Sequence, residues 1–302
     1  MSVKITIVGA GHVGATFAFA LLRSGLASDI VLVDSDRGRL EGEVMDLVHA
    51  TPFSPACRVV AGELADCADS AITVIAAGPG QRPGQTRLDL AKINAGIVDA
   101  LVPEIVRRAP DGLVLLATNP VDVLTRRAVL RAGLPPGRVL GSGTVLDTAR
   151  LRALLARQCG VDARNVHAYV LGEHGESAVP AWSAATVAGV PLREFPGAAP
   201  ALDALFAETR DAAAAIIRRK GATWYAIGAA LVRIVEAVVR DQKSVLTVST
   251  EAPGRGGLCM SVPAVIGAHG VERVLDVGLD GAEQAALDRS AAVLQAAWDA
   301  LG

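Results

Sequence analysis

Residues 4–34, KITIVGAGHVGATFAFALLRSGLASDIVLVD, decide the fold of this chain. A run of β-branched and apolar residues leads directly into Gly9, Gly11 and Gly14, and the apolar spacing that follows is that of a helix. Glycine suits this turn because the chain bends sharply, the backbone must approach a pyrophosphate closely, and the helix N-terminus then faces the phosphates. The stretch therefore predicts the strand, turn and helix of a dinucleotide site.

An acidic residue at the end of the next strand completes this pattern. Asp34 follows Gly14 by twenty residues, the spacing at which a carboxylate meets the ribose hydroxyls of adenosine. Because that carboxylate would repel a 2′-phosphate, we expect NAD rather than NADP as the cofactor, although Arg37 and Arg39 nearby reduce the repulsion. A glycine-rich turn without a ligand is the alternative interpretation.

The rest of the first half alternates short apolar runs with longer helical stretches. Helical periodicity is clear over residues 13–24 and 88–108, and the strand-like runs are KITIVG, DIVLVD, CRVVAG, AITVIAAG and LVLLATN. Repeated strand, crossover helix and strand predict an α/β fold with a Rossmann-type, doubly wound parallel sheet. We place this NAD-binding domain at residues 1–141.

The pattern changes after Gly141. One long alanine-rich helical stretch runs from about Leu202 to Arg240, and KSVLTVST and GLCMSVPAVIG after it have the pattern of antiparallel strands. A last helix is expected over residues 281–301. The sequence therefore predicts a mixed α+β substrate domain at residues 142–302.

Composition limits the function. The 302 residues are 51% hydrophobic and 20% charged with a net charge of -2, which is ordinary for a globular protein and disfavours nucleic acid or membrane partners. No apolar run reaches the roughly 18 residues of a membrane span and no signal peptide precedes the first strand, so we expect a cytoplasmic protein. Four widely spaced cysteines predict reduced thiols and no metal site: Cys57, Cys67, Cys159 and Cys259.

A dinucleotide fold indicates redox chemistry, and reduction of a carbonyl needs a proton donor that works at neutral pH, which is the role of histidine. Of the five histidines, His174 in LGEHGES follows an apolar strand and lies between glycines on a sharp turn, where sites gather in open α/β sheets. His12, His49 and His269 lie in the glycine loop, at a helix end and in a glycine-rich loop, and we interpret them as structural or solvated.

An anionic substrate needs a cation that grips a carboxylate with two hydrogen bonds. Only four of the 29 basic residues are lysine, so an arginine is informative only within a motif. GSGTVLDTARLR places Asp147 and Arg150 on one face of a helix, and GPGQRPGQTRLDL, a loop typical of a mobile lid, ends in Arg87. Solvated surface charges are the alternative for each arginine.

Together these motifs resemble the L-lactate/L-malate dehydrogenase family, and the bacterial lactate dehydrogenases in particular. The motifs GAGHVG, VMDLVHA, GQRPGQTRLDL, ATNPVDVLT, GSGTVLDTARLR, LGEHGES and KGATWYAIG occur in the order and spacing of the family. The resemblance implies an oxidoreductase that transfers a hydride reversibly between NADH and a 2-oxo acid, as in the fermentation of pyruvate to lactate after glycolysis.

The resemblance also implies residue roles. His174 is the proton donor and acceptor, Asp147 orients and stabilises its imidazolium, Arg150 grips the substrate carboxylate and Arg87 polarises the carbonyl. Asn119 and Thr223 line the substrate pocket with Gln81, Arg87 and Arg150. The implied cofactor contacts are Gly9, Gly11, Val13, Gly14, Asp34, Arg39, Gly78, Thr118, Asn119, Ser142 and Ile227.

Substrate choice depends on the residue six before Arg87, which is Gln81. Malate dehydrogenases resemble one another in carrying Arg there, and without a cation the second carboxylate of oxaloacetate would be buried unpaired. We therefore expect pyruvate and L-lactate as substrates. Malate dehydrogenase remains the alternative because Arg82 is adjacent.

Two further residues match an effector site. Arg152 and His167 correspond to positions that bind fructose 1,6-bisphosphate across a subunit interface in allosteric bacterial lactate dehydrogenases, which makes this sugar phosphate a candidate activator and a homotetramer the expected assembly. An ordinary arginine and histidine are the alternative. A non-catalytic NAD-sensing module is an alternative function, but it would not need Arg87, Asp147, Arg150 and His174 together. An NAD-dependent glycosidase is another, but those enzymes resemble much longer chains with a Cys/His metal site, and no cysteine here lies within three residues of a histidine.

Overall fold

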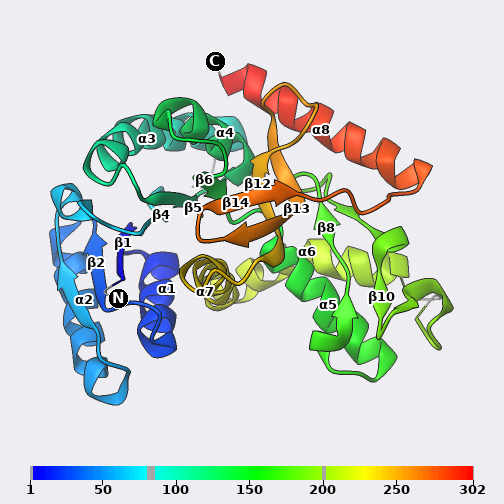
Figure 1. The fold of residues 1–302 in the computed structure, drawn as a ribbon, viewed down its shortest axis with the longest axis horizontal. Coiled ribbons are helices and arrows are strands. Elements are labelled where there is room, and N and C mark those ends of the chain that lie inside the picture. The colour runs from blue at the N-terminus through cyan, green and yellow to red at the C-terminus, as the bar shows by residue number, and fades with distance from the viewer. Residues whose placement is uncertain (1–2, 80–85, 199–201, 302) are drawn as a thin grey trace.

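A nine-stranded sheet forms the centre of the molecule (Figure 1). The computed structural model describes residues 3–79, 86–198 and 202–301. The parallel part of the sheet contains β1 (Lys4–Val8), β2 (Asp29–Val33), β3 (Arg58–Ala61), β4 (Ile72–Ile75), β5 (Leu113–Leu116) and β6 (Val139–Gly141). The antiparallel part contains β12 (Ser244–Glu251), β13 (Cys259–Gly267) and β14 (Gly270–Val274). The strand order across the sheet is β14-β13-β12-β6-β5-β4-β1-β2-β3.

Helices cover both faces of the parallel part, as expected for a doubly wound sheet. The helices are α1 (His12–Ser24), α2 (Arg37–Ala50), α3 (Arg87–Arg108), α4 (Val121–Ala132), α5 (Val145–Cys159), α6 (Leu202–Lys220), α7 (Tyr225–Val239) and α8 (Gly281–Leu301). In Figure 1, α3 and α4 lie on one side of the sheet, and α1 and α7 lie next to each other on the other side. The predicted Rossmann-type fold class is confirmed.

Alternation along the strands explains these two layers. Ile7 packs into the cluster that contains Phe17 of α1 and Leu231 of α7, whereas Val8, the next residue, packs into the cluster that contains Val98 of α3. Successive side chains of a strand point to opposite faces, so an uninterrupted apolar run is what a sheet covered on both faces requires. The core of the dinucleotide half follows directly from its sequence.

The second half adds strands to the same sheet. β12 and β13 pair antiparallel over eight residue pairs, as the sequence predicts, and Ser249 of β12 pairs with Gly141 of β6. Short strands lie outside the main sheet: β7 (Val166–His167), β8 (Val170–Leu171), β9 (Val179–Pro180), β10 (Thr186–Val187) and β11 (Val190–Pro191). Single 3₁₀ turns occupy Thr51–Phe53, Leu64–Cys67, Ala163–Asn165, Trp182–Ala184 and Leu192–Glu194.

The single helical stretch expected from Leu202 to Arg240 is wrong. It is two helices, α6 and α7, separated at Gly221, whose φ of 89° lies in the left-handed region that favours glycine. Alanine periodicity continues on both sides of this break, which is why the pattern alone suggested one helix. The break places Thr223 in the segment between the two helices.

All four cysteines are free thiols. Within the described ranges, no helix combines the length and the apolarity that crossing a membrane requires.

Candidate active site

A sharp turn after β8 carries His174, and three backbone N–H groups in this turn are held by three different elements. Gly172 donates to the carbonyl of Ser261 on β13 at 2.9 Å, and Glu173 donates to the hydroxyl of Ser290 on α8 at 2.8 Å. His174 donates to Oδ2 of Asp122 on α4 at 2.8 Å. The backbone of the turn is therefore fixed by three elements, independently of the contacts that its side chains make.

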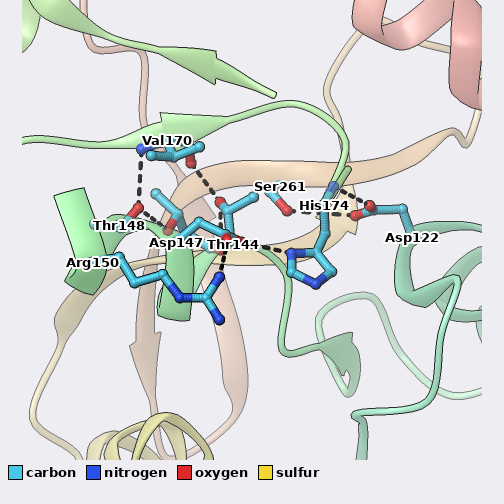
Figure 2. A network of polar contacts seen from close by, with 9 residues as sticks. Asp122, Thr144, Asp147, Thr148, Arg150, Val170, His174 and Ser261 are labelled. Atoms are coloured by element: carbon cyan, nitrogen blue, oxygen red, sulfur yellow. Dashed lines mark hydrogen bonds and ion pairs between the residues drawn. The ribbon is translucent and has the colours of Figure 1, made fainter. Parts of the chain in front are cut away.

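The side chain of His174 contacts Asp147 of α5, which also binds Arg150 of the same helix (Figure 2). Its Nδ1 lies 2.6 Å from Oδ2 of Asp147, and Oδ1 of the same carboxylate accepts a hydrogen bond from Nη1 of Arg150 at 2.8 Å. Asp147 and Arg150 lie three residues apart on the helix, so both project from one face. The three residues that the sequence predicts as a proton donor, its acid and a carboxylate clamp do converge.

Charge and burial together set the protonation of this group. Burial lowers the pKa of His174, but the hydrogen bond and the negative charge of Asp147 outweigh it, and the pKa is raised above its ordinary value. For Asp147 the directions are reversed: burial raises the pKa of its carboxyl, but the contacts with His174 and Arg150 outweigh burial and lower the pKa. The geometry thus favours an imidazolium beside a carboxylate.

Two threonines, Thr144 at the N-cap of α5 and Thr148 within it, attach this helix to the strand that precedes the turn (Figure 2). The hydroxyl of Thr148 accepts from the backbone N–H of Val170 at 3.0 Å, and the hydroxyl of Thr144 donates to the carbonyl of Val170. Both threonine side chains are buried. Asp147 lies between them in sequence, so its distance from His174 is fixed by contacts on both sides.

A cavity of about 650 Å³ opens beside this cluster. Its walls include Asp147, Arg150 and His174, and its opposite side is formed by α6 residues that include Phe206, Thr209, Arg210, Ala213, Ala214 and Ile217. The side chains of Arg150 and His174 keep 15% and 27% of their exposure, so a small anion can reach both.

A second cavity, of about 830 Å³, lies over the carboxyl ends of β1, β2 and β4. Gly9, Gly11, Asp34, Arg39 and Gly78 line it, as the sequence predicts for a dinucleotide site. No side chain of the residues that the structure describes caps the N-terminus of α1, which leaves its first N–H groups available for phosphate oxygens.

Glycine is required at this turn for two different reasons. A Cβ on Gly14 would lie 1.8 Å from the carbonyl oxygen of Gly9, so only glycine lets α1 pack this close to the loop. A Cβ on Gly11 would meet no atom within 4 Å and would instead project into open space at the cavity. These residues fit a dinucleotide whose pyrophosphate lies against the loop.

Asp34 has a further contact that the sequence does not reveal. Its Oδ2 accepts from the backbone N–H of Ala10 at 2.6 Å and its Oδ1 from that of Asp36 at 2.9 Å. The carboxylate therefore braces the glycine loop and still lines the cavity, because its oxygens offer more than two acceptor positions. Arg37 and Arg39 are paired with Glu63 and Asp36.

Among the described residues, the linings of the two cavities do not include Val13, Gly14, Thr118, Asn119, Ser142, Thr223 or Ile227, which the sequence predicts for the cofactor site and the substrate pocket. Thr118 donates to the carbonyl of Ala77 at 2.7 Å, and the carbonyl of Asn119 accepts from Nδ2 of Asn94 at 2.7 Å. Ser142 is buried after β6, whereas Thr223 is half-buried. Val13 and Ile227 are half-buried against the core.

The lid predictions fall largely outside the described residues. Gln81 and Arg82 lie in the segment 80–85, which the structure does not describe. For Arg87, only the backbone is described, as the first residue of α3 after the capping residue Thr86.

The two predicted effector residues differ in their surroundings. Nε of Arg152 donates to the carbonyl of Ala168 at 2.9 Å, and its guanidinium lies 5.3 Å from the ring centre of Tyr169. His167 on β7 is exposed. Arg152 is thus bound to its own chain, while His167 faces outward.

Sequence reasoning missed Asp122, a buried acid in the first turn of α4. Burial raises its pKa to about 6 despite the hydrogen bond from His174, and Ser261 adds a long contact of 3.4 Å. An acid among the apolar residues of ATNPVDVLT was the available signal, but its partner lies 52 residues away.

Comparisons with known proteins agree with this geometry. Residues 3–141 match the family described as lactate/malate dehydrogenase, NAD binding domain, and residues 144–301 match lactate/malate dehydrogenase, alpha/beta C-terminal domain. An L-lactate dehydrogenase of Synechococcus sp. (strain JA-3-3Ab) is 50% identical over 99% of both chains. One of Priestia megaterium is 44% identical over 98% of this chain and 96% of its own.

Two solved structures are similar over nearly the whole chain. A lactate dehydrogenase from a Medee basin deep-sea metagenome library has a TM-score of 0.95 at 39% identity and covers 99% of both chains. The minor L-lactate dehydrogenase of Enterococcus mundtii in a ligands-bound form has the same TM-score and identity, and the match covers 99% of this chain and 98% of that one. The sequence, the fold and the convergent site lead to one assignment, and this chain belongs to the lactate/malate dehydrogenase family.

Proposed function

We propose that this chain is an NAD-dependent L-lactate dehydrogenase that interconverts pyruvate and L-lactate. The observation that carries the proposal is the convergence of His174, Asp147 and Arg150 at one cavity, with 2.6 Å and 2.8 Å joining them. An imidazolium and a guanidinium side by side suit a small anion with a carbonyl next to its carboxylate. Full-length relatives that carry the name L-lactate dehydrogenase support this reading.

His174 holds and releases the proton. Its Nδ1 is engaged by Asp147, so the other ring nitrogen, Nε2, is the one that can donate to a carbonyl oxygen. The raised pKa favours the protonated imidazole, which is the form that can donate to the carbonyl oxygen. In the reverse direction the neutral ring accepts the hydroxyl proton of lactate, and Asp147 stabilises the charge that forms.

The guanidinium groups bind the anion. Arg150 donates one N–H to Asp147, and its guanidinium has further N–H donors for the substrate carboxylate. The bond to Asp147 keeps the guanidinium in place. We assign to Arg87, at the start of α3, the polarisation of the carbonyl, and to Asn119 and Thr223 the remaining pocket contacts. These roles rest on the family motifs.

The residues of the larger cavity fit the nicotinamide cofactor. Gly9, Gly11 and Gly14 would hold its pyrophosphate against the N-terminus of α1, and Asp34 would accept from its adenosine ribose. When bound, NADH supplies the hydride that adds to the carbonyl carbon. We propose residues 1–141 as the NAD-binding domain and 142–302 as the substrate domain, and the family matches at 3–141 and 144–301 support that division.

Pyruvate rather than oxaloacetate is the proposed substrate because Gln81 occupies the position that reads the far end of the substrate. A neutral amide suits a methyl group, whereas a second carboxylate would be buried without a cation. Malate dehydrogenase remains the second candidate through Arg82.

We also propose a cytoplasmic homotetramer with fructose 1,6-bisphosphate as a candidate activator at Arg152 and His167. Large exposed apolar side chains on α1 and α2 support assembly, since Phe19 is 50% and Met45 62% exposed. Four free cysteines suit a reducing compartment.

An anion at the effector position would have to draw Arg152 from the carbonyl of Ala168. Light scattering, and titration of the sugar phosphate at low pyruvate, test assembly and activation.

The deciding experiment is NADH oxidation with pyruvate and with oxaloacetate, using the wild-type protein and His174→Ala. We expect a clear preference for pyruvate and a loss of at least about 10²-fold in kcat for the variant, with NADH affinity nearly unchanged. No turnover with either acid would indicate a non-catalytic NAD-binding module, and a preference for oxaloacetate would make the chain a malate dehydrogenase.

A further inference from the structure

The C-terminal helix α8 reaches the turn that carries His174 through one buried hydroxyl. Ser290 is completely buried, and its Oγ accepts the backbone N–H of Glu173 at 2.8 Å. The fit is tight, because a Cβ on Gly172 would lie 2.5 Å from this oxygen. A residue 116 positions after His174 in the sequence therefore holds the peptide group between Gly172 and Glu173.

The donors and acceptors around Ser290 form a closed ring. The hydroxyl of Ser177 donates to Oε2 of Glu173 at 2.6 Å, so its proton is committed there. The oxygens of Ser177 and Ser290 lie 3.1 Å apart, and Ser290 must be the donor of that pair. The ring runs from the N–H of Glu173 to Ser290, on to Ser177 and back to the carboxylate of Glu173. Each hydroxyl in it both donates and accepts, which strengthens the bonds cooperatively.

This ring spans the residues on both sides of His174. Glu173 precedes the histidine and Ser177 follows it, so the ring closes the turn upon itself and attaches it to α8. The imidazole depends on this backbone for its 2.6 Å approach to Asp147. We propose that Ser290 is a positioning residue for the reaction, which holds His174 at hydrogen-bond distance from Asp147 through the ring with Glu173 and Ser177.

The inference rests on the proposed dehydrogenase function and is tested by a measurement that does not require turnover. Replacement of Ser290 by alanine leaves the N–H of Glu173 buried without an acceptor. In Ser290→Ala we expect the NMR titration of His174 to move to lower pH, because the imidazole is no longer held against Asp147. The other charged groups that face the imidazole, Arg150 on α5 and Asp122 on α4, are unchanged. We expect kcat with pyruvate to fall about tenfold, with NADH affinity unchanged.

Two further variants separate positioning from stability. Leu294→Ala, one turn after Ser290 on α8, removes a buried apolar side chain but none of the hydrogen bonds of the ring, and it should lower Tm while the His174 titration and kcat stay at wild-type values. Ser177→Ala breaks the ring without changing a residue of α8, and it should change the titration in the same direction. The double variant with Ser290→Ala should be no worse than Ser290→Ala alone.

The outcomes are distinct. A His174 titration and a kcat in Ser290→Ala that match those of Leu294→Ala would overturn the inference, and if Ser290→Ala does not fold, an unchanged titration in Ser177→Ala would overturn it equally. A wild-type protein that does not reduce pyruvate would refute the proposed function, whereas the titrations would still decide whether Ser290 positions the imidazole.

Discussion

The backbone N–H of His174 donates to Oδ2 of Asp122 at 2.8 Å, so an acid on α4 holds the residue whose ring meets an acid on α5. Asp122 is only 2% exposed. One carboxylate fixes the backbone of His174 and the other orients its imidazole. Residues from both halves of the chain therefore hold the candidate proton donor His174 in place.

Asp122→Ala should remove the acceptor of the His174 N–H. We expect the free energy of unfolding at pH 7.5 to fall by about 1–3 kcal/mol, because a buried donor is left unpaired, and kcat to fall with it. Burial raises the pKa of Asp122 to about 6 in the folded protein, whereas an unfolded carboxyl ionises at about 3.9. The difference in the free energy of unfolding between wild type and variant should therefore decrease as the pH rises between these two values, and it should stay constant above them. Denaturant titrations at several pH values measure this, and equal stability at every pH would contradict it.

Asp147→Asn should change the pH dependence of pyruvate reduction. The rate requires a protonated His174 and falls as the pH rises through its pKa, which Asp147 raises. Loss of that charge should move the falling limb of kcat/KM to lower pH by about one unit or more, although Asp122 and Arg150 still face the ring. A pH–rate profile whose limb does not move would remove Asp147 from its assigned role.

Arg150→Lys should raise KM for pyruvate by about 10²-fold, because an ammonium cannot replace a planar fork on a carboxylate. NADH affinity should not change. Arg157→Lys is the matched control: it lies on the same helix, is 70% exposed and pairs with Glu208 at 3.6 Å. Pyruvate kinetics that respond alike in both variants would exclude the clamp.

Asp34→Ser should weaken the preference for NADH. The serine removes a charge that would repel a 2′-phosphate and can still accept from the N–H of Ala10. We expect kcat/KM with NADPH to rise by about tenfold relative to NADH, because Arg37 and Arg39 line the cavity and can exchange their pairing with Glu63 and Asp36 for the phosphate. Steady-state kinetics with both cofactors provide the measurement, and a wild-type enzyme that already prefers NADPH would refute the assignment of Asp34.

Asp99→Asn should loosen the attachment of α3 to α4. Asp99 accepts from Arg127 at 2.6 Å and from Arg131 at 2.7 Å, and these arginines hold its pKa well below the usual range. We expect a loss of about 1–2 kcal/mol in the free energy of unfolding at pH 7. This loss should decrease as the pH falls below about 4, where the unfolded carboxyl takes up its proton, and it should vanish only at the lowered pKa of the folded carboxylate. Asp162→Asn is the control, because Asp162 pairs with Arg164, which is 90% exposed, and its loss should leave Tm unchanged. Equal effects of the two variants would show that the α3–α4 contact contributes nothing special.

The dinucleotide half could be predicted in detail because its signals are local. Glycine spacing, apolar strands and the acid at Asp34 each report on residues close in sequence, and the structure shows them at one cavity. The substrate half was predicted less well, since the break at Gly221 is hidden within alanine periodicity. The contacts of Asp122 and Ser290 with the His174 turn span more than fifty residues, and no local pattern marks them.

The fold class, the glycine loop and the residue types of the candidate site follow from the sequence alone, because strand alternation, helical spacing and turn chemistry are properties of neighbouring residues. The three-dimensional structure was needed to show that β12–β14 complete the sheet of the first half, that Asp34 braces the loop it follows, and that α4 and α8 fix the His174 turn. These contacts depend on the packing of distant elements, in which a hydrogen bond forms wherever burial leaves a donor in need of an acceptor.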